Sequence, residues 1–285
     1  MSAQDAGVHS PGQVRDAALA LSDAGAWGLV GTAPRATAAP AQGEAQAGPG
    51  ALVQVWDLPL RIFHWGLVLS VTCAIVSGKA GGRWLEVHHA AGVAIVGLLV
   101  FRLVWGLLGT QTARFAAFAP TPRALRSYLR GRWRGVGHNP LGALSVAAML
   151  GLLALQASTG LFSDDDIDFT GPLNALVSGA TAARLTGIHR IAANGLFGLL
   201  ALHVAAVAVH LRVKKDDILR PMWSGWKRLP GRVDLRPAHP LGLACALAVA
   251  LAVSLAADGR FPFGAGARAA APAASTTATA PHAAW

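Results

Sequence analysis

Histidines inside long apolar segments are the residues of this sequence best suited to chemistry. His64, His88, His189 and His203 lie in such segments, and His89 stands beside one of them. Ionisable side chains are costly within apolar stretches of this kind, so each is a candidate for a functional site. Because imidazole nitrogens bind metals and carry protons, these histidines could hold a metal centre or move protons.

Two of these histidines share one apolar segment, and their spacing is informative. His189 and His203 are 14 residues apart. At about 100° and 1.5 Å per residue of α-helix, they point in nearly the same direction, at depths that differ by about 21 Å. The segment therefore presents one imidazole at each of two levels.

The segments that carry the histidines are long enough to cross a membrane. The chain is 53% hydrophobic and only 13% charged, and its apolar runs approach the roughly 20 residues that a bilayer requires. In lipid, backbone polar groups must be satisfied within each segment, so the runs are predicted to be helices. The predicted fold is an all-α membrane protein, a four-helix transmembrane bundle with a fifth, C-terminal transmembrane helix. The runs cover residues 60–78, 88–109, 141–162, 188–211 and 241–257.

The rest of the sequence divides into tails and a linker. Residues 1–50 and 258–285 are rich in small residues and proline, a composition that buries too little apolar surface to fold, so both are predicted to be disordered tails. Residues 51–230 form the predicted four-helix domain, and residues 231–257 form the linker and the fifth helix.

The connecting loops differ in charge, and this difference predicts the orientation of the helices. Loops 110–139 and 212–238 are strongly basic, whereas 163–187 is rich in aspartate. Basic loops tend to remain in the cytoplasm, so we expect a bacterial inner-membrane protein with a cytoplasmic N-terminus. Topology then accounts for the net charge of +10, and nucleic acid is not an expected partner.

This orientation sorts the four histidines into two pairs. His64 is level with His203 near the cytoplasmic side, and His88 is level with His189 near the outer side. Two facing imidazoles suit an iron porphyrin with both axial positions filled, so we predict two haem b groups with these four histidines as iron ligands. The sequence has no C-x-x-C-H motif, which excludes covalent attachment of the c type.

Two features around the pairs leave alternatives open. His89 lies about 100° round the helix from His88, so His88 is preferred as the ligand, but His89 could replace it. Haem propionates need cationic partners, and Arg61, Arg102 and Arg190 stand at suitable levels. The alternative for each arginine is an interfacial side chain that reaches for the membrane surface.

Short motifs surround these histidines. They are Val55-Trp56-Asp57-Leu58-Pro59 with Arg61-Ile62-Phe63-His64-Trp65, Trp84-Leu85-Glu86-Val87-His88 with Gly92, Phe101-Arg102-Leu103-Val104-Trp105-Gly106, Gly137-His138-Asn139-Pro140-Leu141-Gly142 and Thr159-Gly160-Leu161-Phe162. Over roughly residues 52–228 the chain resembles the bacterial cytochrome b561 family, which is similar to the b-type cytochrome subunit of nickel–iron hydrogenases. The resemblance implies two bis-histidine haems, held by His64, His88, His189 and His203, that exchange electrons with membrane quinone and a redox partner. His138 is expected to be a cap or interface residue and not a ligand.

These features predict a one-electron relay. With both axial positions filled, the irons have no open position for oxygen or substrate. The expected function is electron transfer through the membrane between quinone or quinol and a partner, such as a periplasmic c-type cytochrome or a hydrogenase or reductase subunit. Trp56, Asp57 and Arg61 are expected to border a quinone pocket on the cytoplasmic side. The alternatives are an anchor subunit that docks a hydrogenase-like complex and a haem-free transporter whose histidines serve ions or protons.

Overall fold

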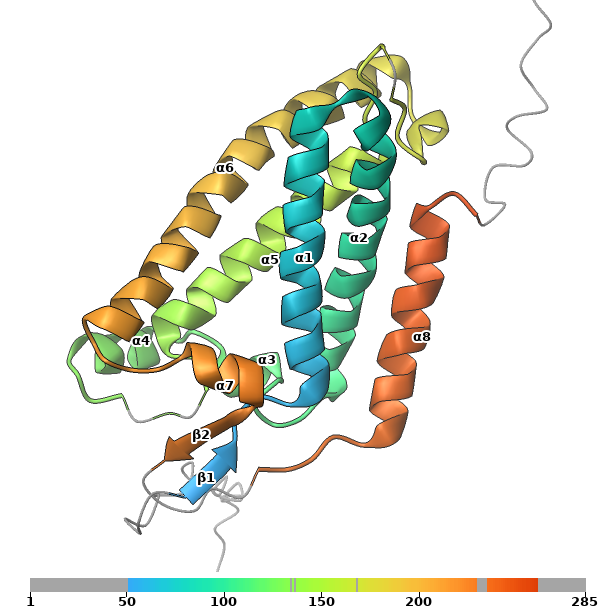
Figure 1. Cartoon of the computed structure of the whole chain (residues 1–285). Coiled ribbons are helices and arrows are strands. Elements are labelled where there is room, and N and C mark those ends of the chain that lie inside the picture. Colours follow the sequence, from blue (N-terminus) through green and yellow to red (C-terminus); the bar gives the residue numbers. More distant parts are fainter. Residues whose placement is uncertain (1–50, 134, 136, 168, 230–234, 261–285) are drawn as a thin grey trace, which may run out of the picture. The chain divides into compact units, whose positions relative to one another are not determined.

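The computed structural model describes residues 51–260 except 134, 136, 168 and 230–234 (Figure 1). All of them belong to one compact unit. The tails predicted for 1–50 and 258–285 lie outside the described residues, apart from 258–260. Within the described part, five helices are long and apolar enough to cross a membrane. This confirms the prediction of an all-α membrane protein with a fifth spanning helix.

The spanning helices are labelled α1, α2, α5, α6 and α8, and shorter elements lie between them. The long helices cover Leu58–Ala80, Leu85–Leu108, Pro140–Leu161, Gly179–Arg212 and Pro240–Ala257 in that order. The short elements are β1 (Ala51–Gln54), η1 (Gly82–Trp84), α3 (Phe115–Phe118), α4 (Pro122–Leu129), η2 (Asn174–Leu176), α7 (Leu219–Ser224) and β2 (Trp226–Leu229).

Side-chain caps fix where three of the long helices begin. Asp57, Asn139 and Ser178 each accept a hydrogen bond from the backbone N–H three residues further on, in α1, α5 and α6 respectively. The cap at Ser178 places the start of α6 at Gly179, well before the apolar run predicted at 188–211. The first turns of α6 mix alanines and glycines with two threonines and an arginine, so the apolar pattern alone missed them.

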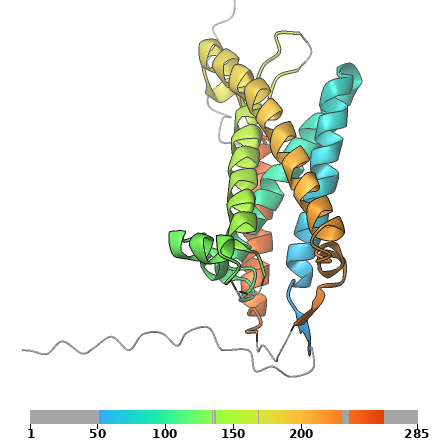
Figure 2. The same ribbon diagram turned by 90° about the vertical axis from the view of Figure 1, so that its left-hand side faces the viewer.

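The long helices pack in a chain of neighbours. α1 packs on α2, α2 packs on α5 and α8, and α5 packs on α6, an arrangement that can be followed in Figure 1 and, turned by 90°, in Figure 2. One buried apolar cluster, around Val71, Leu99, Leu153 and Leu196, joins α1, α2, α5 and α6. The helices that carry the histidines are therefore held in one bundle.

The two ends of the bundle differ in charge and in structure. We call the end with residues 109–139 and 213–239 the basic end, and the end with residues 81–84 and 162–178 the acidic end. At the basic end β1 and β2 form an antiparallel pair in which Ala51 faces Leu229 and Gln54 faces Trp226. Figures 1 and 2 show α4 and the two strands at this same end.

The strand pair and α7 bind the start of α1 to the segment that follows α6. The Trp56 backbone N–H donates to the Gly225 carbonyl at 3.1 Å. Arg61 Nη1 donates to the Trp223 carbonyl at 2.6 Å, and Trp65 Nε1 donates to the Met222 carbonyl at 3.3 Å. We call β1, β2, α7 and these contacts the clasp. Neither the strands nor α7 was expected from the sequence.

Candidate functional site

The structure brings His88 of α2 and His189 of α6 together near the acidic end. Their ring centres are 6.1 Å apart, and the ring planes are inclined at 82°. With a metal–nitrogen bond of about 2 Å to each ring, two imidazoles on opposite sides of one metal ion have ring centres about 6 Å apart. The separation of these two rings therefore fits a shared metal.

Each of the two rings is oriented by a backbone carbonyl of a neighbouring helix. His88 Nδ1 lies 2.7 Å from the Ala74 carbonyl of α1, and His189 Nδ1 lies 2.9 Å from the Gln156 carbonyl of α5. Because a carbonyl only accepts, each Nδ1 carries the proton and each Nε2 keeps its lone pair. At His189 the side-chain amide of Gln156 donates to that lone pair at 3.0 Å. Metal-bound imidazoles are commonly held by such a bond from the other ring nitrogen.

Two glycines make room for these rings. A Cβ added to Gly78 of α1 would lie 2.8 Å from His88 Nδ1, and one added to Gly160 of α5 would lie 2.9 Å from His189 Cε1. Any larger residue at either position would displace the imidazole from its carbonyl. Sequence reasoning did not identify Gly78, Gly160 or Gln156 as part of the site.

A cavity of about 510 Å³ adjoins this pair between α1, α2, α5 and α6. Its lining is mostly apolar and includes His88, His89, His189 and Arg190. Largely apolar cavities of this size with a few polar groups are typical of sites for cofactors and other small molecules. Arg190 is exposed at this cavity, where a cation can meet an anionic group of a ligand.

His89 lines the same cavity but is engaged elsewhere. Its Nε2 lies 2.7 Å from Oδ1 of Asp258, the residue that follows α8. Its ring meets Phe169 edge-on, with 6.4 Å between the ring centres. His88, and not His89, therefore faces His189 in this arrangement.

The other two histidines lie toward the basic end on α1 and α6. His64 and His203 are partly buried and close enough to interact electrostatically. His64 Nδ1 is buried and has no hydrogen-bond partner among the described residues. This nitrogen is therefore free to bond to a bound group.

Further buried polar atoms near His64 share this lack of a partner. Within the described part of the chain, Arg61 Nε, Arg102 Nη1 and His138 Nδ1 are buried without a hydrogen bond. Buried polar atoms are nearly always bonded, so this set fits a bound group that supplies acceptors, such as the carboxylates of a haem. A metal site built from three or more histidine, cysteine or acidic side chains does not occur among the described residues.

Arg102 is held inside the bundle by aromatic rings. Its side chain is only 2% exposed, and its guanidinium lies 4.4 Å from the ring centre of Phe115 and 5.9 Å from that of Phe118. Ring faces attract cations, which offsets part of the cost of burying this charge. The guanidinium also interacts electrostatically with Asp57, and its Nη1, which has no hydrogen bond among the described residues, is free to donate to a bound carboxylate.

Trp56 and Asp57 were expected to border a quinone pocket, but both side chains already contact other residues of the protein. Asp57 caps α1 and accepts hydrogen bonds from Trp105 Nε1 at 3.1 Å and from Thr110 Oγ1 at 2.5 Å. The ring of Trp56 is buried, 4.6 Å from that of His138. Arg61, with its unpaired Nε, is the expected pocket residue that keeps a free donor.

His138 packs between aromatic rings and does not cap α5. Asn139 is the capping residue, while the His138 ring lies 4.6 Å from Trp56 and 4.8 Å from Phe118. Burial, together with the charges of Arg102 and His64, lowers the pKa of His138 to about 4. His138 is therefore neutral at physiological pH.

We expect His138 to make stability depend on pH. In the unfolded chain a histidine is protonated below about pH 6.5, whereas folded His138 takes up a proton only near pH 4. Its full contribution is therefore present above pH 6.5 and is lost as the pH falls through this window. The loss is about 1 kcal/mol per pH unit. Thermal unfolding of the solubilised protein should depend less steeply on pH in His138→Gln, and an unchanged slope would contradict the assignment.

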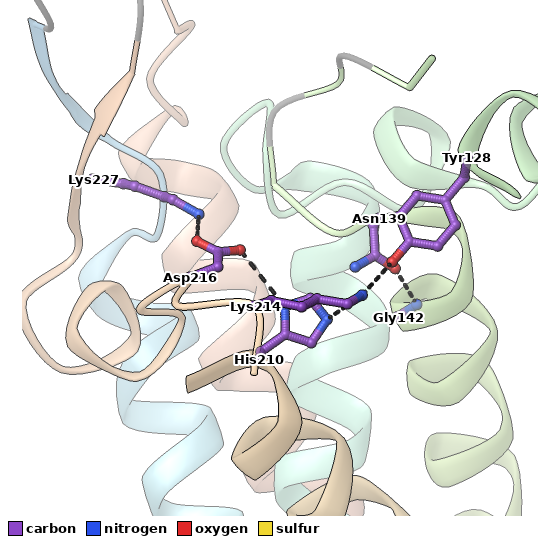
Figure 3. A network of polar contacts seen from close by, with 7 residues as sticks. All are labelled: Tyr128, Asn139, Gly142, His210, Lys214, Asp216 and Lys227. Atoms are coloured by element: carbon purple, nitrogen blue, oxygen red, sulfur yellow. Dashed lines mark hydrogen bonds and ion pairs between the residues drawn. The ribbon is translucent and has the colours of Figure 1, made fainter. Parts of the chain in front are cut away.

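A polar network at the basic end joins α6 to β2 and α4 (Figure 3). Lys227 donates to Asp216 at 2.9 Å, and the other oxygen of Asp216 lies 3.6 Å from His210 Nδ1. Lys214 Nζ lies 3.3 Å from the Tyr128 hydroxyl and 3.5 Å from His210 Nε2. The hydrogen bond from Lys227 lowers the pKa of Asp216, which stays ionised at neutral pH. The network ties the end of α6 to two elements outside the spanning helices.

Loss of this network should have a small effect. The Lys227–Asp216 pair is partly exposed, and such pairs contribute less than about 1 kcal/mol. Asp216→Ala and Lys227→Ala should each lower the free energy of unfolding by that order, and the double variant should lose less than the sum because the two residues share one bond. Additive losses in denaturant titrations would show that the pair does not interact.

Comparisons with known proteins place most of the chain in one family. Residues 55–225 match the family model of prokaryotic cytochrome b561. The chain is 21% identical, over 215 residues, to a probable Ni/Fe-hydrogenase 1 B-type cytochrome subunit of Escherichia coli (strain K12), with 61% of this chain and 89% of that protein covered. It is 24% identical to a probable Ni/Fe-hydrogenase B-type cytochrome subunit of Azotobacter chroococcum mcd 1 over 221 residues, 61% of this chain and 88% of that one. No solved structure matches the chain significantly. Since the family model spans more than half of the sequence, the chain is a membrane-spanning b-type cytochrome of the prokaryotic cytochrome b561 family.

Proposed function

We propose that this cytochrome holds two haem b groups and passes electrons across the bacterial inner membrane between quinone and a redox partner. One haem would be held by His88 and His189, and the other by His64 and His203. A haem iron between two imidazoles supplies one-electron transfer with no open coordination position. The observation that carries the proposal is the His88–His189 pair, whose ring centres are 6.1 Å apart and whose Nδ1 atoms are both hydrogen-bonded to backbone carbonyls.

The side chains around each pair have separate roles in this proposal. The backbone carbonyls of Ala74 and Gln156 accept the Nδ1 protons, which leaves a lone pair on Nε2 of His88 and of His189. At His189 a metal would replace the side-chain amide of Gln156, which donates to Nε2 at 3.0 Å. Arg190, which lines the acidic-end cavity, and Arg61 and Arg102, which have unpaired buried nitrogens at the basic end, would bind the carboxylates of the cofactors. The apolar walls of the bundle exclude water from the electron path.

The proposed orientation puts the basic end in the cytoplasm. Its loops carry the arginines and lysines that favour this side of the membrane. His64 and His203 then lie toward the cytoplasm, and His88 and His189 lie toward the outside. Because His189 and His203 are about 21 Å apart along α6, two haems at these levels would carry electrons through much of the bilayer.

The partners follow from the two ends. We place quinone near Arg61 at the basic end, together with Trp56 and Asp57, and a redox protein at the acidic end, for example a periplasmic c-type cytochrome. The names of the relatives favour a second role, as the membrane anchor of a hydrogenase-like complex. A stand-alone relay should purify with both haems and oxidise quinol directly, whereas an anchor should lose stability without its partner.

The test is the haem content and spectrum of the purified full-length protein. Dithionite-reduced minus oxidised spectra should show low-spin b-type bands, and pyridine haemochrome analysis should give two haems per chain. Absence of low-spin bands in a folded preparation would eliminate the relay and leave a haem-free transporter. One haem per chain would retain a b-type cytochrome but refute the two-haem arrangement.

A further inference from the structure

The fifth helix is additional to the part of the chain that matches the family. The family model ends at residue 225, while α8 covers Pro240–Ala257. Figure 1 shows α8 beside α2, and the two helices approach closely where small residues meet. A Cβ on Gly97 of α2 would collide with Ser254 Oγ, and Ala246 and Ala250 are buried. α8 therefore packs closely against α2 as part of the bundle.

The C-terminal end of α8 holds one side chain of α2. Asp258 Oδ1 accepts a hydrogen bond of 2.7 Å from His89 Nε2, and its Oδ2 lies 2.5 Å from Arg260 Nε. The bond from His89, with help from Arg260, lowers the pKa of Asp258. Asp258 is therefore a carboxylate at neutral pH and a strong acceptor for His89.

His89 is a competitor of His88. The two are neighbours on α2, both partly buried, and both line the acidic-end cavity that His189 also lines. Adjacent residues differ by about 100° around the helix axis, so the first turns of α2 must rotate by about that angle for His89 to take the place of His88. The bond to Asp258 occupies His89 Nε2, whereas His88 is bonded through Nδ1 and keeps Nε2 for a metal.

We propose that Asp258 selects the ligand of the acidic-end haem: by holding His89 on α8, it leaves His88 as the histidine that binds iron opposite His189. This inference rests on the proposed function, because it presupposes a haem at this pair. Asp258 is a positioning residue, since it acts through His89. Asp258 is the residue that ends α8, so this role depends on the fifth helix, which lies outside the region that matches the family model.

The test asks whether His89 can replace His88 once it is released. In His88→Ala the acidic-end haem should fall below a tenth of the wild-type amount. In His88→Ala/Asp258→Ala it should recover to at least half, and in His88→Ala/His89→Ala/Asp258→Ala the recovery should vanish. The matched control is His88→Ala/Arg260→Ala, which removes the other partner of Asp258 and should show no recovery. Haem per chain is measured by pyridine haemochrome, and ligation is measured by low-temperature EPR of the oxidised protein.

The single variant Asp258→Ala provides a second readout. It should keep two haems but split the low-spin EPR signal of the acidic-end haem into two species, of which one disappears in Asp258→Ala/His89→Ala. Asp258→Ser, whose hydroxyl is too short to reach His89, serves in all backgrounds if the alanine variant does not fold. A single unsplit signal would overturn the inference.

The outcomes separate this inference from the proposed function. Retention of the acidic-end haem by His88→Ala alone would show that His89 needs no release, and failure of Asp258→Ala to restore it would show that Asp258 does not restrain His89. Either result overturns the selection of the ligand by Asp258. The proposed relay still stands in that case if the wild-type protein contains two haems. A wild-type protein without haem would overturn both.

Discussion

Replacing His203 with alanine is expected to reduce the haem content of the purified protein from two per chain to one. His64 would then face a methyl group, and a haem with one axial ligand on the basic-end side is held too weakly to survive purification. The acidic-end pair should keep its haem because His189 lies about 21 Å along the same helix. Pyridine haemochrome analysis and redox titration should show one remaining low-spin haem.

A matched control stands on the same face of α6. His210 follows His203 by seven residues, which is nearly two helical turns, but it interacts with Asp216 and Lys214. His210→Ala should therefore retain both haems. If His203→Ala loses both haems, either the two sites load cooperatively or the pairing of the histidines is wrong.

Gly160→Ala is expected to weaken the acidic-end haem strongly although it changes no ligand. The new methyl group would stand 2.9 Å from His189 Cε1, so the ring must leave the Gln156 carbonyl that fixes its proton on Nδ1. Loss of an outer hydrogen bond to a ligating histidine typically lowers affinity for the bound metal about 10- to 100-fold. Haem retention during dilution, followed by absorbance, should show this loss for one haem of the two.

The control for this substitution lies on the same helix. Gly151 of α5 has open space where a Cβ would stand, so Gly151→Ala should leave haem retention unchanged. Gly78→Ala should repeat the effect from the other side, through His88. Equal retention in Gly160→Ala and Gly151→Ala would mean that the position of the His189 ring does not govern binding.

The spanning helices and the levels of the histidines could be predicted from the sequence because both depend on local regularities. Apolar runs of sufficient length define the spans, and the bounds of α1 and α5 differ from the predicted 60–78 and 141–162 by at most two residues at each end. The 14-residue spacing of His189 and His203 fixes their common direction on α6. These features need no knowledge of which helices are neighbours.

The supporting residues could not be predicted because they depend on how the helices pack. Gly78 and Gly160 resemble any other glycine of a membrane helix until the neighbour of each is known. The carbonyls of Ala74 and Gln156 carry no sequence signal at all. The bond between His89 and Asp258 joins residues that are 169 positions apart, and it separates two adjacent histidines that the sequence left as alternatives.

The clasp has a consequence for how the protein is assembled. Among the helix pairs that pack closely in the described part, none joins α1 to α6. The hydrogen bonds of the clasp link the two helices at the basic end, whereas further along they meet through apolar contacts of Val71 and Leu196 and through Lys79 beside the Phe197 ring. Because their hydrogen bonds lie at the basic end, we expect α1 and α6 to separate more readily at the acidic end, and we expect haem to enter between them from that end. The site at His64 and His203 must then receive its haem before the site at His88 and His189, since a haem already bound at the acidic end would block the path.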